Sequence, residues 1–300
     1  MKHRNAGNVR VLIAVDNPIV RSGVHNALRD AGYLSVIMIT GPDQIDIIER
    51  EIFDLIILSA FMGDRPFMPV ITSMRDGKTN HHAFPIVILL MPEAGHGTIS
   101  EAISSGADDV LLMPISTGQL IRRTNALTLQ RKQFVLSRDY TGPDRRTDVR
   151  PGFSQVQVMD PPNPLKSKLD GHSDAEIKRQ IDAASKKMNQ VKMEAYGQQI
   201  DWIIRAIGEM FRTGSLDSAN LEGYAVSLKR MASDLPSRLG NKMTKRIAAL
   251  LNDVIGSADH IARDGLSLKP DDLALISLAC GALTKELGKL RDVSDGKNVA

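Results

Sequence analysis

The chain has 300 residues, of which 42% are hydrophobic and 24% charged, and its formal net charge is +3. This composition is that of a soluble protein with one large domain or two smaller ones. Basic and acidic residues balance along the sequence: 1–135 carries 13 of each, 136–172 six against five, and 173–300 19 against 17. Nucleic-acid-binding domains usually carry a clear basic excess, so we expect no nucleic-acid partner.

No segment has the pattern of an export signal or a membrane span. The longest apolar run, "FPIVILLMP", is far shorter than the roughly 20 residues that a membrane helix needs. The charged N-terminus precedes too short an apolar run for a signal peptide. The single cysteine, Cys280, cannot form an internal disulfide and lies in a helical, apolar setting. We therefore expect a cytoplasmic protein without membrane contact and with a buried thiol.

Residues 9–133 alternate short apolar runs with helix-like segments. The runs are apolar on both faces, as is typical of parallel strands covered by helices on both sides. Pro18 and Pro42 stand where helices are expected to begin, and Gly32 and Gly106 where they end. Five strand–helix units predict a doubly wound α/β domain with a five-stranded parallel sheet. The expected strands are 9–15, 34–39, 54–58, 85–90 and 109–113, and the expected helices are 18–32, 42–52, 66–76, 97–106 and 116–133.

Residues 134–172 differ in character from the segments on either side. They are rich in Pro, Arg and Asp and show neither a helical nor a strand period. We interpret them as an extended linker.

Residues 173–296 have a helical pattern. Ser173 can cap a helix, because Glu176 stands three residues further on, and no strong breaker follows before Gly214. Further helices are expected at 216–234, 237–263 and 270–292, which predicts an all-α domain, either a four-helix bundle or a coiled coil. Within the first helix a heptad seam over 177–202 favours a homodimer; its positions hold Ile177, Ile181, Ala184, Met188, Val191, Ala195, Gln198 and Trp202.

In a doubly wound sheet the functional crevice lies outside the carboxyl ends of the strands. The segments that form these ends are "VRVLIAVDNPIVRSGVHNALRDAGY", "FDLIILS", "FPIVILLM" and "SSGADDVLLMPIS". In this order they resemble the first strand and helix, the third strand, the fourth strand and the fifth strand of a response-regulator receiver domain. The resemblance covers about 125 residues, 9–133, and implies a flavodoxin-like fold.

The resemblance also implies a particular chemistry at the strand ends. In the family an acidic pair and an acceptor aspartate hold Mg²⁺, which prefers oxygen ligands. A lysine neutralises the transferred phosphoryl group. A hydroxyl residue then bonds a phosphoryl oxygen and moves, which repacks the face that binds partners.

Residue by residue, this chemistry does not carry over. Of the acidic pair only Asp16 remains, because Val15 stands at the first of the two positions. Ser59 stands at the position of the acceptor aspartate, and Leu90 at that of the hydroxyl residue. Met113 stands at the position of the lysine and is followed by Pro114. A serine hydroxyl without an adjacent base is a weak nucleophile. An unpaired buried charge is costly, which explains an uncharged side chain at the lysine place. We expect a degenerate phosphoacceptor pocket without catalytic residues or a metal site, in which Mg²⁺ binding is lost or weak.

The leading hypothesis is a two-component-type signalling protein that acts as a non-phosphorylatable pseudo-receiver and protein-interaction adaptor. It would not be an enzyme, and its partners would be a kinase, a phosphotransfer protein or a regulator. The alternative is a working phosphorelay response regulator with a non-standard acceptor, either Asp64 or His260. A third hypothesis, an enzyme with its site in the helical half, has no supporting sequence feature.

His81 and His82 suggest a metal site, but they lie in a polar segment without further ligands at useful spacing, so we expect both histidines to lie at the surface.

Overall fold

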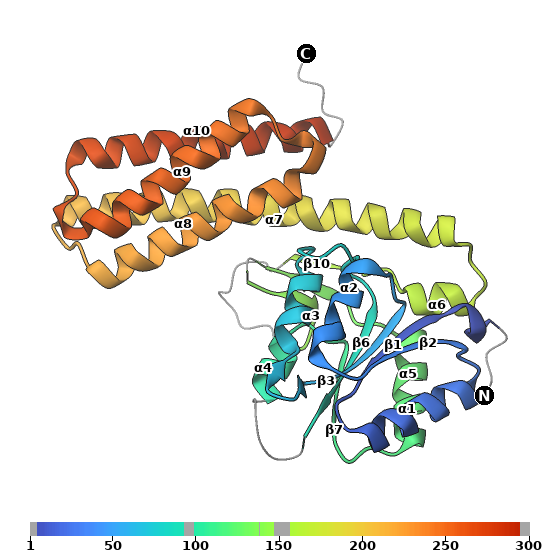
Figure 1. The fold of residues 1–300 in the computed structure, drawn as a ribbon. Coiled ribbons are helices and arrows are strands. Elements are labelled where there is room, and N and C mark those ends of the chain that lie inside the picture. The colour runs from blue at the N-terminus through green and yellow to red at the C-terminus, as the bar shows by residue number, and fades with distance from the viewer. Residues whose placement is uncertain (1–4, 93–98, 138, 147–156, 295–300) are drawn as a thin grey trace. The chain divides into compact units, whose positions relative to one another are not determined.

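The computed structural model describes residues 5–92, 99–137, 139–146 and 157–294 (Figure 1). The chain divides into two compact units, residues 1–187 and residues 188–300. The first unit is built on a parallel sheet and the second is helical, as the sequence predicted for the two halves.

The first unit contains a five-stranded parallel sheet with the strand order β2-β1-β3-β6-β7. This is the predicted doubly wound arrangement. Each strand lies within one residue of its predicted run, because an apolar run of this length between turn residues is readily accommodated as a buried strand. The strands are β1 (Arg10–Ala14), β2 (Ser35–Ile39), β3 (Leu55–Ser59), β6 (Ile86–Met91) and β7 (Asp109–Leu112).

Helices cover both faces of this sheet, and each face has its own apolar core (Figure 1). Helices α1 (Pro18–Ala31) and α5 (Thr117–Leu129) cover one face, and the other is covered by α2 (Ile47–Arg50), α3 (Met68–Arg75) and α4 (Ile99–Ser104). The predicted helix 42–52 is a 3₁₀ helix, η2 (Pro42–Asp46), followed by α2. Of the predicted helix 97–106, residues 97 and 98 lie outside the described residues. A short 3₁₀ helix, η1 (Ala6–Asn8), precedes β1.

Helix α1 begins and ends where its sequence predicts. The Asn17 side chain accepts hydrogen bonds from the backbone N–H groups of Ile19 (2.9 Å) and Val20 (3.2 Å), while Pro18 occupies the first turn. At the other end Gly32 has φ +104°, a conformation that favours glycine, and its N–H closes the last turn on the Arg29 carbonyl. These caps fix where the chain leaves β1 and where it enters β2.

A two-stranded hairpin between β3 and α3 is absent from the sequence prediction. It consists of β4 (Phe61–Met62) and β5 (Arg65–Pro66), joined by Gly63 and Asp64. Gly63 has φ +57°, as the first central residue of a type II′ turn requires. Strands of two residues are too short to show the alternation that identifies a strand in a sequence.

The segment predicted as a linker is largely ordered structure where it is described. It contains β8 (Phe134–Leu136), β9 (Thr141–Pro143) and β10 (Gln157–Met159), which form an antiparallel sheet in the order β10-β8-β9, and the short helix α6 (Pro164–Leu169). Residues 147–156 of the segment lie outside the described residues. The prediction of an extended chain without regular elements is therefore wrong here, because elements of three to six residues give no measurable period.

A buried cluster of charges ties this added sheet to the parallel sheet. Asp108 accepts hydrogen bonds from Arg75 Nη2 (2.7 Å) and Arg131 Nε (2.8 Å), and each of these three side chains is at most 4% exposed. Both guanidinium groups lie over the ring of Phe134, at 5.1 and 4.7 Å from its centroid. Arg75 also donates to the carbonyl oxygens of Gly106, Ala83 and Pro85. We call Arg75, Asp108, Arg131 and Phe134 the arginine cluster.

The arginine cluster predicts an unequal response to two neighbouring substitutions. Asp108→Asn leaves two buried guanidinium groups with one carboxylate fewer, so we expect a loss of about 3–5 kcal/mol in the free energy of unfolding. Asp109 pairs with Arg123, whose side chain is 52% exposed, so Asp109→Asn should cost about 1 kcal/mol or less. Urea denaturation of both variants measures the difference. Equal losses would contradict the role assigned to the cluster.

The described part of the second unit consists of packed helices around one apolar core. Helix α7 (Asp174–Thr213) begins in the first unit and continues into the second. It starts with the predicted capping box, since Glu176 N–H donates to Ser173 Oγ (3.3 Å) and Ser173 N–H donates to Glu176 Oε2 (2.9 Å). The other elements are α8 (Ser218–Leu239), η3 (Gly240–Lys242), α9 (Lys245–Asp264), η4 (Gly265–Ser267) and α10 (Pro270–Ser294).

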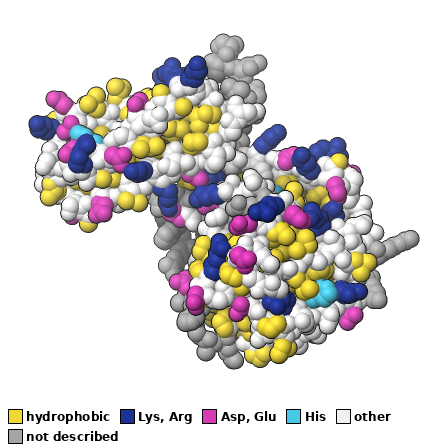
Figure 2. Space-filling view, viewed as in Figure 1, with side chains coloured by type: hydrophobic (Ala, Val, Ile, Leu, Met, Phe, Trp, Pro, Cys, Tyr) yellow, Lys and Arg dark blue, Asp and Glu magenta, His cyan; other side chains and the backbone are white. Residues whose placement is uncertain are grey.

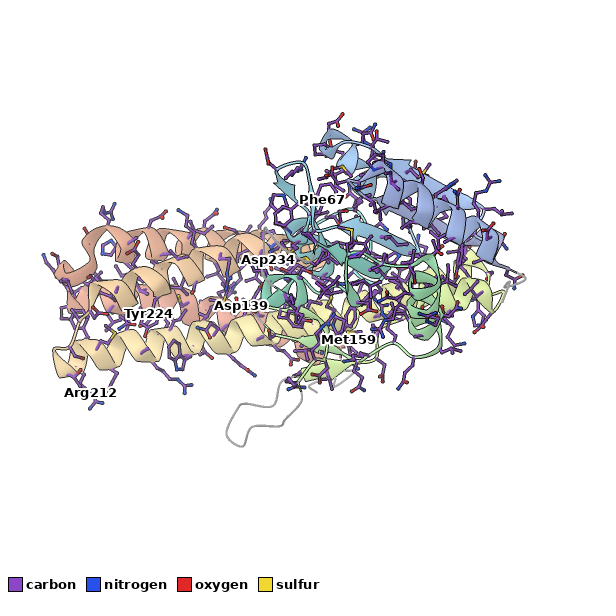
Figure 3. All side chains as sticks on the ribbon, turned by 90° about the horizontal axis from the view of Figure 1, so that it is seen from below. Phe67, Asp139, Met159, Arg212, Tyr224 and Asp234 are labelled. Atoms are coloured by element: carbon purple, nitrogen blue, oxygen red, sulfur yellow. The ribbon has the colours of Figure 1, made fainter. Side chains whose placement is uncertain are left out.

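The predicted end of helix α8 at residue 234 is too early, because the helix continues through Pro236 to Leu239. The buried carboxylate of Asp234 holds this last turn (Figure 3): it accepts hydrogen bonds from Arg238 Nε (2.5 Å) and from Tyr196 Oη on α7 (2.6 Å). Tertiary hydrogen bonds of this kind outweigh the helix-breaking tendency of one proline near a helix end.

Cys280 on α10 is fully buried, as predicted, and burial raises the pKa of its thiol to about 12.

The heptad seam over 177–202 is largely covered within the chain itself. Ile177, Ile181 and Met188 are 5%, 9% and 2% exposed, whereas Trp202 at the far end is 53% exposed. A seam whose first half is buried is not available to a second chain. The structure therefore does not support a homodimer through 177–202.

Among the helices that the structure describes, none combines the length and the apolar character that a membrane span requires.

Candidate functional site

The crevice of the parallel sheet lies where the strand order reverses, between the carboxyl ends of β1 and β3. Asp16 follows β1 and Ser59 is the last residue of β3. Leu90 on β6 pairs in register with Ser59, and Met113 follows β7. The fold thus brings together at one edge of the sheet the residues predicted for the site.

Ser59 is buried and its hydroxyl already has a hydrogen-bond partner. The residue is 4% exposed, and its Oγ accepts a hydrogen bond from the backbone N–H of Asp16 (3.2 Å). Side chains alternate along a strand, so Ser59 points to the same side of β3 as Leu55 and Ile57, which belong to the core under α1 and α5. The serine therefore joins the ends of β1 and β3 and is turned toward an apolar core.

Asp16, the one acidic residue left at the family's acidic pair, binds the backbone of the hairpin. Its side chain is exposed, and Oδ1 accepts a hydrogen bond from the N–H of Gly63 (3.2 Å). Arg21 Nη1 donates to the carbonyl oxygens of Val15 (2.7 Å) and Asp16 (3.2 Å) just after β1. The carboxylate thus holds the β4–β5 turn. Sequence reasoning missed this contact because it did not predict the hairpin.

The remaining positions of the crevice are apolar. Val15 and Leu90 are fully buried in the core under α1 and α5, and Met113 packs against the same core while partly exposed. Exposed Pro114 follows Met113 through a cis peptide bond. Within the described residues, no group of three or more His, Cys, Asp or Glu side chains could hold a metal ion. The crevice can donate and accept backbone hydrogen bonds, but its side chains offer little for a phosphoryl group.

The two alternative acceptors lie in different units: Asp64 follows Gly63, whose N–H donates to Asp16 at the crevice, and His260 lies in the helical unit. Asp64 is exposed in the β4–β5 turn. His260 on α9 lies between two carboxylates: Nδ1 is 3.3 Å from Asp264 Oδ2, and Nε2 is 3.4 Å from Asp272 Oδ1. Its Nε2 atom is shielded from solvent. The imidazole is thus placed to bridge α9 and α10 rather than to take a group from solvent.

His81, expected at the surface, is 3% exposed. Its Nε2 accepts a hydrogen bond from the N–H of Phe53 (2.7 Å), and Nδ1 donates to the carbonyl oxygen of His82 (2.8 Å). The ring stacks on Phe53 with 6.1 Å between the centroids. Burial lowers the pKa of His81 to about 4. A neutral, buried histidine at the start of β3 is a structural residue, at the opposite end of this strand from Ser59.

The pKa of His81 predicts that acid destabilises the first unit. In the unfolded chain the imidazole takes up a proton near pH 6.5, but in the folded chain only near pH 4. The unfolded state therefore binds more protons between these values, and stability falls as the pH falls from 6.5 to 4, by on the order of 3 kcal/mol. His81→Gln should lose this component of the acid dependence in urea titrations. The same substitution at exposed His172 is the control for replacing a histidine with glutamine.

A comparison with models of protein families finds a match that includes the residues of this crevice. Residues 11–125 match the model of the response regulator receiver domain. The first unit contains a receiver domain. The resemblance seen in the sequence is thereby confirmed, and the strand order agrees with it. The matched residues end within α5, so the added sheet, α6 and the helical unit lie outside the receiver match.

Individual proteins are also similar to this chain over part of its length. Transcriptional activator protein PfeR of Pseudomonas aeruginosa is 27% identical over 125 residues, which are 42% of this chain and 39% of that protein. The match thus spans about two fifths of this curated relative. The chemotaxis response regulator CheY4 of Vibrio cholerae is 21% identical, with 40% of this chain and 98% of that one covered and a TM-score of 0.35. A response regulator from Thermotoga maritima is 22% identical, with coverage of 41% and 98% and a TM-score of 0.34.

The match to a protein named as a transcriptional activator contradicts the prediction of no nucleic-acid partner. That prediction rested on an even balance of charge over segments longer than 30 residues. Recognition of a nucleic acid depends on where a few cations lie on a surface, and a segment with zero net charge can present them on one face. The exclusion is therefore wrong.

The geometry of the receiver crevice predicts that substitutions at Ser59 and at Met113 affect stability in a coupled way. Ser59→Asp places a carboxylate in a buried position without an added cation, so we expect a loss of about 2 kcal/mol or more in stability. Adding Met113→Lys should recover part of that loss, with a coupling energy of about 1–3 kcal/mol in a double-mutant cycle. Ser59→Ala is the control for the lost hydrogen bond and should cost about 1 kcal/mol. Additive effects in urea denaturation would show that the two positions do not share a site.

Proposed function

We propose that the receiver domain is a pseudo-receiver, which takes no phosphoryl group, and that the chain acts as a protein-interaction adaptor without enzymatic activity. The observation that carries this proposal is the state of Ser59. Its hydroxyl is buried and bonded to the Asp16 N–H, and the side chains beside it are aliphatic. A nucleophile for phosphoryl transfer needs to be exposed to the donor and activated by a base or a metal.

Weak or absent Mg²⁺ binding is part of the same proposal. The metal in a receiver needs several oxygen ligands, and carboxylates supply most of its charge compensation. At this crevice Asp16 contributes one carboxylate, which already accepts a bond from Gly63, while Val15 and Ser59 contribute none. A single solvated carboxylate leaves the ion mostly to water.

A pseudo-receiver of this kind would present one surface to its partners at all times. In the active family the hydroxyl residue moves toward the phosphoryl group and repacks the partner-binding face. Leu90 stands at that place and is fully buried in a packed core. Without a polar ligand to attract it, the side chain gains nothing by moving, so partner binding would be set by the amount of each protein rather than by phosphorylation.

The alternative, a working phosphorelay member, has less support from the geometry. Asp64 lies on a surface turn, and within the described residues it belongs to no group of three or more His, Cys, Asp or Glu side chains that could hold a metal ion. His260 has both ring nitrogens beside carboxylates. Neither residue has the surroundings that activate an acceptor.

The proposal is tested by offering the full chain a phosphoryl donor. Incubation with Mg²⁺ and acetyl phosphate, followed by intact mass measurement, should show no added phosphoryl group. An active receiver domain treated in parallel is the positive control. A stoichiometric adduct that is stable to acid but labile to base would overturn the pseudo-receiver. If such an adduct disappears in Asp64→Asn but persists in Ser59→Ala, the non-standard acceptor is identified.

A further inference from the structure

Helix α10 has an exposed apolar face opposite the face that it buries. Leu275 and Leu278 are 67% and 71% exposed, whereas Ile276, Cys280 and Leu283 on the other side are at most 2% exposed. From 273 to 284 the sequence "LALISLACGALT" contains no charged residue. Figure 2 shows hydrophobic side chains at the surface of the helical unit, among charged ones. Single exposed leucines are common, but two on one uncharged face mark a candidate contact surface.

The face has a pattern that is symmetric about Leu278. In an α-helix the positions three, four and seven residues away lie on the same side. On this side Leu275 and Ala274 lie before Leu278, and Gly281 and Ala282 lie after it. A Cβ atom added to Gly281 would meet nothing within 4 Å, so there is open space over the glycine. The face ends in exposed Asp271 on one side and exposed Lys285 on the other. We call these seven residues the α10 stripe.

The symmetry makes the α10 stripe complementary to a second copy of itself. If two α10 helices pack antiparallel with the two-fold axis at Leu278, each position meets the position equally far on the other side. Leu275 then lies over the space above Gly281 of the partner subunit, and Ala274 faces Ala282 of the partner subunit. Asp271 faces Lys285 of the partner subunit, and the reverse pair forms as well, as an isologous contact requires. Leu275 thus meets a glycine, the alanines meet each other, Leu278 meets its own copy at the axis, and opposite charges meet at both ends.

The charges at the two ends are available for this pairing. Within the described residues neither Asp271 nor Lys285 forms an ion pair or side-chain hydrogen bond, although their neighbours do: Asp272 contacts His260 at 3.4 Å, and Glu286 contacts Lys289 at 2.7 Å. A parallel pairing would instead place Asp271 against Asp271 and Lys285 against Lys285 of the partner subunit. Charge therefore selects the antiparallel arrangement.

We propose that the chain self-associates through the α10 stripe, as an antiparallel two-fold pair of α10 helices. The occupant of the apolar face is a second copy of the chain, because the stripe complements itself in size and in charge. From Asp271 to Lys285 the stripe is about 21 Å long, so the buried area is at the small end for protein interfaces and the association is expected to be weak and concentration-dependent. The proposal is independent of the chemistry of the receiver crevice.

The test measures the association of the full-length chain by sedimentation velocity over a range of concentrations. Wild type should form dimers with a dissociation constant in the micromolar range. Leu278→Asp places two carboxylates against each other at the two-fold axis and should raise the dissociation constant about tenfold or more. Val226→Asp is the matched control, because Val226 is a similarly exposed apolar residue (62%) on α8, and it should dimerise as wild type does. Far-ultraviolet circular dichroism confirms that each variant is folded.

A charge-reversal cycle tests the antiparallel geometry itself. Asp271→Lys alone and Lys285→Asp alone each bring like charges together at both ends, so each should weaken the dimer several-fold. The double variant restores opposite charges only in the antiparallel arrangement, so it should recover most of the wild-type affinity. A wild-type chain that stays monomeric at high concentration, an unaffected Leu278→Asp variant, or a double variant no stronger than its two parents would each overturn the proposal.

Discussion

A charged side chain that is buried away from water needs an oppositely charged partner. The two ends of the parallel sheet meet this constraint in different ways. At the carboxyl ends of the strands the positions that carry charges in receiver domains hold Val15, Ser59 and Met113, and the pocket is filled by apolar contacts. Near the amino ends the side chain of Asp108 is buried, and two guanidinium groups donate hydrogen bonds to it. The carboxyl end has no charge at these three positions, whereas the amino end has a buried carboxylate within a set of hydrogen-bonded side chains. Either arrangement avoids an unpaired buried charge, whereas an intermediate arrangement would not.

The two ends also differ in what they hold together. The arginine cluster joins α3, the start of β7 and the end of α5 by buried hydrogen bonds, and its two guanidinium groups connect them to the added antiparallel sheet by lying over the ring of Phe134 on β8. At the crevice the Asp16–Ser59 and Asp16–Gly63 bonds, in which backbone N–H groups donate, join the end of β1 to the end of β3 and to the hairpin. Active sites usually break local rules of packing and charge in order to work. A crevice that follows these rules throughout is consistent with a domain kept for its shape.

The sequence was most informative where a pattern is repeated over several residues. Apolar runs located the strands of the parallel sheet to within one residue, and the serine–glutamate spacing located the start of α7. Patterns failed where elements are short or where contacts join distant residues. The hairpin β4–β5 and the strands β8 to β10 have two or three residues each, and Arg75 reaches a carboxylate 33 residues away. His81 was taken as a surface residue because its neighbours are polar, yet one hydrogen bond from Phe53 N–H and a stacked ring bury it.

For the candidate site, the sequence identified which residues meet but not how they are engaged. Strand order alone implies that Asp16, Ser59, Leu90 and Met113 share an edge, since the carboxyl ends of parallel strands lie together. It does not reveal that the Ser59 hydroxyl accepts a bond from the Asp16 backbone, or that the Asp16 carboxylate turns away to bind Gly63. These bonds matter for function because they occupy the two polar side chains that remain in the crevice. That the remaining polar side chains of the crevice already accept bonds from backbone N–H groups supports the proposal that it binds neither a divalent ion nor a phosphoryl group tightly.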